Sequence, residues 1–74
     1  MNNKQAVLLN YSMMCGEISQ VLSEKVDFMS RFFREEPSLN QDADLLQVAS
    51  AFRAFVTSFK ELDDTVDTIG ELND

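Results

Sequence analysis

The stretch that decides the fold runs from residue 45 to residue 69 and reads LLQVASAFRAFVTSFKELDDTVDTI. Its large apolar residues recur in alternating steps of three and four, which is the spacing of a helix with one continuous apolar seam. The pattern lasts for four heptads. We call its members the assembly seam: Leu45, Val48, Phe52, Phe55, Phe59, Leu62, Val66 and Ile69. The pattern predicts a helix over about residues 41–69, with Gly70 as its C-terminal cap.

A broader apolar stripe runs through the first half of the chain. It consists of three columns that repeat every seven residues, and eleven of the twelve positions are apolar or aromatic. The columns are Val7, Met14, Val21 and Phe28; Leu8, Cys15, Leu22 and Met29; and Tyr11, Ile18, Lys25 and Phe32. This stripe predicts a helix over about residues 3–34.

The exception in the stripe is Lys25. One interpretation is that its stem lies along the edge of the stripe while its ammonium stays in water. The other is that it fixes the register or the oligomeric state, as a polar residue in an apolar seam can. In that case any salt-bridge partner of Lys25 should come from another chain.

The break between the two helices falls around Pro37. Proline disfavours helical geometry at the residue before it and cannot donate a hydrogen bond to the preceding turn. Ser38 with Gln41 matches a capping box for the second helix, and Asn40 is a rival cap. A short turn between long helices makes them antiparallel neighbours. Residues 1–74 are therefore predicted to form one all-α domain, an antiparallel two-helix hairpin.

Two helices alone cannot cover both the three-column stripe and the assembly seam. We therefore expect self-association or a partner protein to complete the hairpin to a bundle. A homodimer that closes into a four-helix bundle is the favoured form.

The overall charge excludes several classes of partner. The 74 residues include 13 acidic and 6 basic side chains and no histidine, giving a net charge of −7. This balance argues against nucleic-acid binding, which needs a basic surface, and against docking on anionic lipid. A hydrophobic fraction of 45% indicates a folded chain rather than a disordered one.

The sequence contains no enzyme or cofactor motif. Without histidine there is no Ser-His-Asp or Cys-His pair, and there is neither a P-loop nor a glycine-rich dinucleotide fingerprint. The single cysteine, Cys15, lies on the apolar stripe, which favours a buried, inert thiol. We predict no catalytic, cofactor-binding or metal-binding residues. No apolar run is long enough for a signal peptide or a membrane helix, so a cytoplasmic location without membrane insertion is expected, although signal-less export stays possible.

Two surface features are candidate binding sites. The first is an apolar patch at the turn, formed by Phe33, Leu39 and Leu46. The second is an acidic surface near the C-terminus, where no base follows Lys60. Its members are Glu61, Asp63, Asp64, Asp67, Glu71 and Asp74. The acidic surface either only solubilises the chain or binds a basic partner.

These features favour a non-enzymatic protein–protein interaction module, a small helical subunit or adaptor that self-assembles or docks on a partner. A small acidic inhibitor of the phage or plasmid type, which blocks a basic site on a target, is the alternative. In architecture alone the chain is also similar to small dimeric four-helix-bundle regulators, to type III secretion needle subunits and to the helical cochaperones of those subunits. Needle subunits join two helices across a proline-containing turn, and Pro37-Ser38-Leu39-Asn40 resembles that turn.

Overall fold

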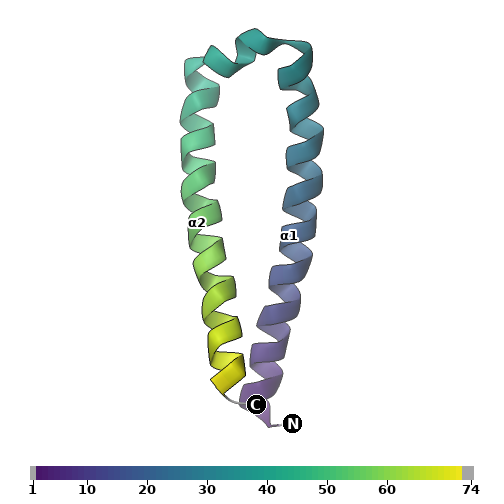
Figure 1. Cartoon of the computed structure of the whole chain (residues 1–74), viewed down its shortest axis with the longest axis vertical. Helices are drawn as coiled ribbons and strands as arrows, with labels where there is room; N and C mark the ends of the chain where they lie inside the picture. Colours follow the sequence, from purple (N-terminus) through teal and green to yellow (C-terminus); the bar gives the residue numbers. More distant parts are fainter. Residues whose placement is uncertain (1, 73–74) are drawn as a thin grey trace.

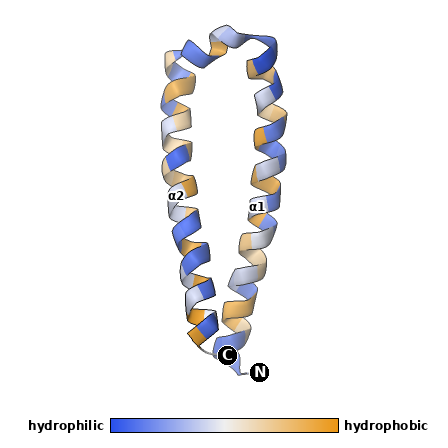
Figure 2. Ribbon diagram, in the orientation of Figure 1, coloured by the Kyte–Doolittle hydropathy of each residue, from blue (hydrophilic) through white to orange (hydrophobic). Residues whose placement is uncertain are grey.

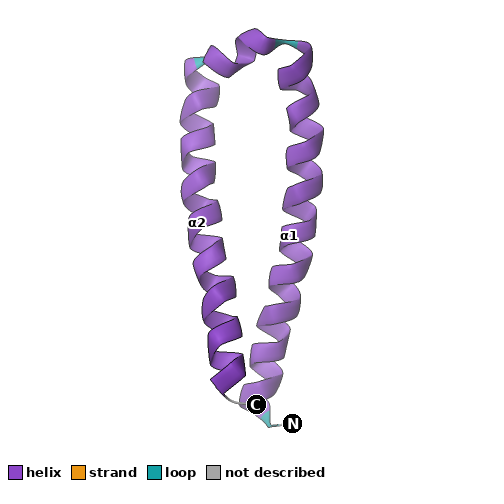
Figure 3. Ribbon diagram, in the orientation of Figure 1, coloured by secondary structure: helices purple, strands orange, loops and turns teal. Residues whose placement is uncertain are grey.

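Two long helices lie side by side and run antiparallel in the computed structural model, which describes residues 2–72 (Figure 1). Helix α1 spans Asn3–Glu35, a short 3-10 helix η1 spans Pro37–Gln41, and helix α2 spans Ala43–Leu72. Only short loop segments interrupt the helices, and no strand occurs in the described range (Figure 3). The molecule measures 52 × 19 × 15 Å. The prediction of an all-α hairpin is confirmed, and completion of a bundle stays a prediction.

Helix α1 begins at a capping box that the sequence analysis did not identify. The backbone N–H of Gln5 donates to the side-chain oxygen of Asn2 at 2.8 Å, and the backbone N–H of Asn2 donates to Oε1 of Gln5 at 3.1 Å. These bonds satisfy backbone donors that the first helical turn leaves free. At the other end Glu36 leaves helical geometry, with φ −134° and ψ 83°. This is the restriction that Pro37 was predicted to impose.

The start of α2 differs from the prediction. Ser38, Asn40 and Gln41 belong to the 3-10 helix, so neither the predicted capping box nor the rival cap at Asn40 begins α2. Instead the backbone N–H of Leu45 donates to Oδ1 of Asp42 at 3.0 Å, and α2 begins two residues later than expected, at Ala43. The reason is that Pro37 initiates a tight turn of its own, which uses the intervening residues.

The end of α2 also differs. Gly70 was predicted to cap the helix, but α2 continues through it to Leu72, and no glycine adopts a positive φ. A glycine costs a helix interior only about 1 kcal/mol relative to alanine, so one glycine does not end a helix that is otherwise favourable. Similarly, α1 extends one residue beyond the predicted boundary, to Glu35.

The two helices are closest near the chain ends and diverge toward the turn (Figure 1). Buried side chains follow the same trend. Among the described residues only two are buried, Cys15 of α1 and Val66 of α2, and both lie in the half of the hairpin that holds the chain ends. The hairpin therefore has a packed half and an open half.

Candidate interaction surface

The packed half is organised around Cys15, whose side chain is only 1% exposed. Burial raises the pKa of its thiol, and the negative charges of Asp63 and Asp67 raise that pKa further. A thiol held in its protonated form is a poor nucleophile. The interpretation of Cys15 as a buried core residue is confirmed.

The assembly seam divides into two columns in the structure. The inner column, which faces α1, consists of Leu45, Phe52, Phe59 and Val66. Its exposed fraction falls from 36% at Leu45, near the turn, to 7% at Val66, and the two phenylalanines are half-buried. The inner column therefore packs against α1 only where the helices are close.

The outer column of the seam is open near the turn and less exposed toward the chain ends. Val48 is 65% exposed, Phe55 49%, and Leu62 and Ile69 are each 37% exposed. These residues follow the inner column by three positions, which places them about 60° around the helix axis. The hairpin alone therefore leaves Val48 and Phe55 about half exposed or more, whereas Leu62 and Ile69 are mostly covered.

Helix α1 divides in the same way. Its inner column contains Leu8, Cys15, Leu22 and Met29, and exposure along it rises from 1% at Cys15 to 48% at Met29. The neighbouring outer column is exposed throughout: Val7 54%, Met14 39%, Val21 54% and Phe28 53%. Each outer residue precedes an inner one by a single position and so lies about 100° around the axis.

The two outer columns lie on the same broad side of the hairpin. Each outer column is rotated away from the inner column of its own helix, and the direction of rotation is the same for both when each helix is viewed from its N-terminus. In an antiparallel pair, positions displaced in the same sense fall on the same side of the pair. We call this surface the uncovered face, and it consists of Val7, Met14, Val21, Phe28, Val48, Phe55, Leu62 and Ile69. Hydrophobic residues accordingly recur along both helices (Figure 2).

The opposite side of the hairpin is mixed: it carries a row of serines, which the sequence analysis missed, together with the exposed apolar side chains of Leu9, Val26, Leu46 and Val56. Ser12, Ser19, Ser23 and Ser30 follow the inner column of α1 on its other flank, opposite the uncovered face. Asp63 and Asp67 lie on the corresponding flank of α2. The signal was present in the sequence as serines at helical spacing. Its meaning depended on knowing which column faces α2.

Aromatic contacts occur within each helix rather than between the helices. Phe28 and Phe32 of α1 meet edge to face at 5.4 Å. On α2, Phe55 stacks on Phe52 at 6.3 Å and on Phe59 at 6.2 Å. Among the described residues no ring pair joins α1 to α2. The phenylalanines are thus ordered within their own helices, and their outward surfaces stay open.

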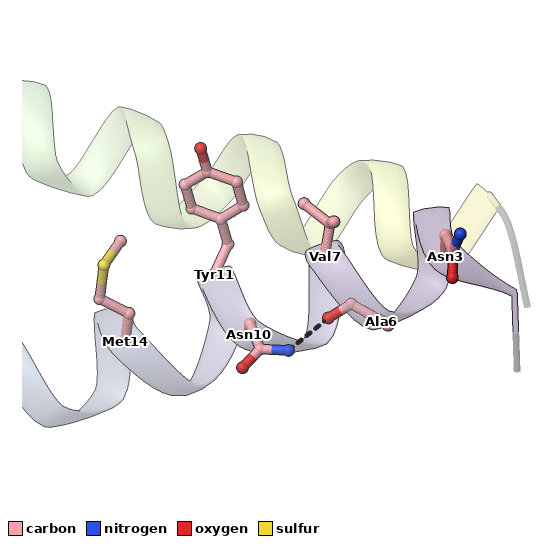
Figure 4. Close-up of a pocket in the computed structure, with 6 residues that line it drawn as sticks. All are labelled: Asn3, Ala6, Val7, Asn10, Tyr11 and Met14. Atoms are coloured by element: carbon pink, nitrogen blue, oxygen red, sulfur yellow. Dashed lines mark hydrogen bonds between the residues drawn. The ribbon is translucent and has the colours of Figure 1, made fainter.

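A shallow hollow on α1 belongs to the same side of the molecule. Val7, Tyr11 and Met14 project from one side of the helix there (Figure 4). The rest of its lining comes from Asn3, Ala6 and Asn10, and Nδ2 of Asn10 donates to the carbonyl oxygen of Ala6 at 2.7 Å. All of the lining residues come from a single helix, so the hollow is a part of the open surface of α1.

The predicted patch at the turn is only partly open. Phe33 and Leu39 are half-buried, whereas Leu46 is 50% exposed. Among the acidic residues, Glu61, Asp64, Asp67 and Glu71 are exposed and Asp63 is half-buried between the helices. Asp74 lies outside the described residues. Both features remain predictions, and neither is as large as the uncovered face.

Residues 2–72 contain neither a metal-binding cluster nor a membrane-spanning helix. No group of three or more histidine, cysteine, aspartate or glutamate side chains is placed to hold a metal ion. Within the same range neither helix is apolar enough over its length to cross a bilayer.

The chain matches no protein-family model, no curated protein and no solved structure. Its surface is therefore the guide to its function.

Proposed function

We propose that this protein is a non-enzymatic protein–protein interaction module whose binding surface is the uncovered face. The observation that supports this proposal is the exposure of eight large apolar side chains, from 37% to 65%, on one side of the hairpin. Monomeric soluble proteins rarely expose an apolar surface of this extent without using it for binding.

The stacking of the phenylalanine rings along α2 supports the same function. Phe55 is 49% exposed while its ring stacks on two neighbours. An aromatic side chain that is already restricted loses little conformational entropy on binding, and such residues commonly act as interface anchors. Phe55 is the central anchor of the proposed surface.

Site-specific photo-crosslinking tests the proposal. A photoreactive amino acid replaces Val48, which is 65% exposed on the uncovered face, in cells that naturally make the chain. The matched control replaces Ser50, which is also exposed but lies on the outer side of α2. We expect a discrete covalent product from position 48 and none from position 50. Equal yields at the two positions would refute the proposal.

An acidic inhibitor is the second candidate, and it is favoured by the exposure of Glu61, Asp64, Asp67 and Glu71 along the last turns of α2. Acidic residues near a helix C-terminus oppose the helix dipole, so they lower helix stability slightly where they stand. A third crosslinking position at Asp64 separates the two functions. A product from position 64 and none from position 48 would support the inhibitor.

A further inference from the structure

The solvent-accessible surface of the chain is larger than that of a compact monomer of the same mass. The hairpin exposes 6108 Å² for a mass of 8.4 kDa. Compact monomers of this mass expose about 4,600 Å², so the excess is about 1,500 Å². Obligate homodimers bury about 1,000–2,500 Å² per chain. The excess surface of the hairpin thus lies within the range of area that each chain buries in a stable homodimer.

We propose that a second copy of this chain covers the uncovered face, so that two hairpins lie antiparallel and form a four-helix bundle. This inference rests on the proposed function and names its partner. The two-fold axis relates the outer column of each helix to the same column in the second copy, so residues at the middle of the hairpin, such as Val21, pack near their own counterparts. Such self-complementary contact is what a two-fold symmetric interface requires.

Charge decides the relative orientation of the two copies. The end of the hairpin that holds the chain ends carries five described acids on α2, from Glu61 to Glu71, with Lys4 and Lys60 as the described bases there. The turn half is less acidic: it contains four bases, Lys25, Arg31, Arg34 and Arg53, and six acids, Glu24, Asp27, Glu35, Glu36, Asp42 and Asp44. A parallel arrangement would place both acidic ends together, which is unfavourable. The antiparallel arrangement separates them and places each beside the less acidic half of the other copy.

Lys25 lies on the side of α1 that the second copy covers in this arrangement. It is exposed within the apolar side of α1, between the inner and outer columns. Val21 is midway in sequence between Asn3, where α1 begins, and Leu39 in the turn, so it marks the middle of the hairpin. Lys25 and Glu17 lie four residues on either side of Val21. Two centred antiparallel hairpins therefore place Lys25 of one copy level with Glu17 of the other.

Sedimentation of the purified chain across a concentration range is the first half of the test. We expect a monomer–dimer equilibrium for the unaltered chain. Phe55→Asp should raise the dimer dissociation constant more than about tenfold, because an unpaired carboxylate is costly to bury. The matched control Thr57→Asp adds the same charge on the outer side of α2 and should leave that constant nearly unchanged. A monomer at all concentrations, or equal effects of the two substitutions, would overturn the inference.

Spin labels determine the orientation even where Phe55→Asp fails to fold. In a Cys15→Ala background, a label at Ser38→Cys marks the turn and a label at Ser23→Cys marks the middle of the hairpin. The antiparallel dimer should separate the two turn labels by close to the 52 Å length of the hairpin, and the middle labels, which lie on the outer surfaces of the bundle, should be closer together than the turn labels. In a parallel dimer the turn labels would instead lie within about 20 Å, since packed helix axes are about 8–10 Å apart. That result would overturn the antiparallel arrangement.

The outcome also separates the two proposals. A folded monomer that still gives a crosslinked product with a different protein at position 48 would refute the second copy and leave the proposed function standing. No product at position 48 would refute both.

Discussion

Two valines of α2 provide a paired test of where the hairpin is packed. Val66 is 7% exposed on the inner column, and Val48 is 65% exposed on the outer column near the turn. Both are replaced by alanine, which removes the same two methyl groups. The same chemical change therefore measures the two environments directly.

The expected magnitudes follow from the two exposures. At Val66, removing two buried carbons costs about 1.6 kcal/mol, and incomplete closure of the cavity raises this to about 2 kcal/mol. Alanine has a better helix propensity than valine, which stabilises the helix by about 0.5 kcal/mol, so the net loss of unfolding free energy is about 1.5 kcal/mol. At Val48 about a third of the side chain is covered, and its loss of about 0.5 kcal/mol is cancelled by the same propensity gain.

The assay is urea unfolding followed by far-ultraviolet circular dichroism, first at a protein concentration where the chain is monomeric and then where it is dimeric. In the monomer we expect Val66→Ala to lower the unfolding free energy and Val48→Ala to leave it unchanged. In the dimer Val48→Ala should cost about 1–1.5 kcal/mol per chain, because the second copy covers that position. An unaltered stability for Val66→Ala would refute the packing of α1 against α2. A Val48→Ala variant that stays neutral at every concentration would refute the antiparallel dimer.

Three further predictions concern single residues. Gly16→Ala and Gly70→Ala should each raise the unfolding free energy by about 0.5–1 kcal/mol, since a Cβ meets no atom within 4 Å at either position; a thermal melt that shows a loss would contradict the open space described there. Asp42→Ala should cost about 1 kcal/mol by removing the acceptor for the backbone N–H of Leu45, whereas Asp42→Asn should cost little, and equal losses in urea would disprove the cap. Because the pKa of the Cys15 thiol is raised in the folded chain, stability should fall as the pH rises above the ordinary value of 9.0, and Cys15→Ala should remove that part of the pH dependence; parallel pH profiles would count against a buried thiol.

The helices themselves were predictable because their signals are local. Apolar residues at steps of three and four define α2, and the predicted end of α1 near Pro37 was one residue from the observed end at Glu35. The ends of α2 were predicted less well, because capping depends on geometry that neighbouring residues compete to set. Ser38 has a side chain suitable for a cap, but it belongs to the 3-10 helix that begins at Pro37. Asp42 lies directly before α2, and its carboxylate oxygen accepts the backbone hydrogen bond that caps the helix.

The sequence by itself determined that both helices carry more apolar surface than a hairpin can bury. It did not determine which part of that surface is left open, since all members of the assembly seam look equivalent as a pattern. The tertiary structure decided that question through the relative rotation of the helices and their divergence toward the turn. Val66 is buried and Phe55 is half exposed. The reason is that contact between two helices depends on the direction and separation of their axes, which a local sequence pattern does not specify.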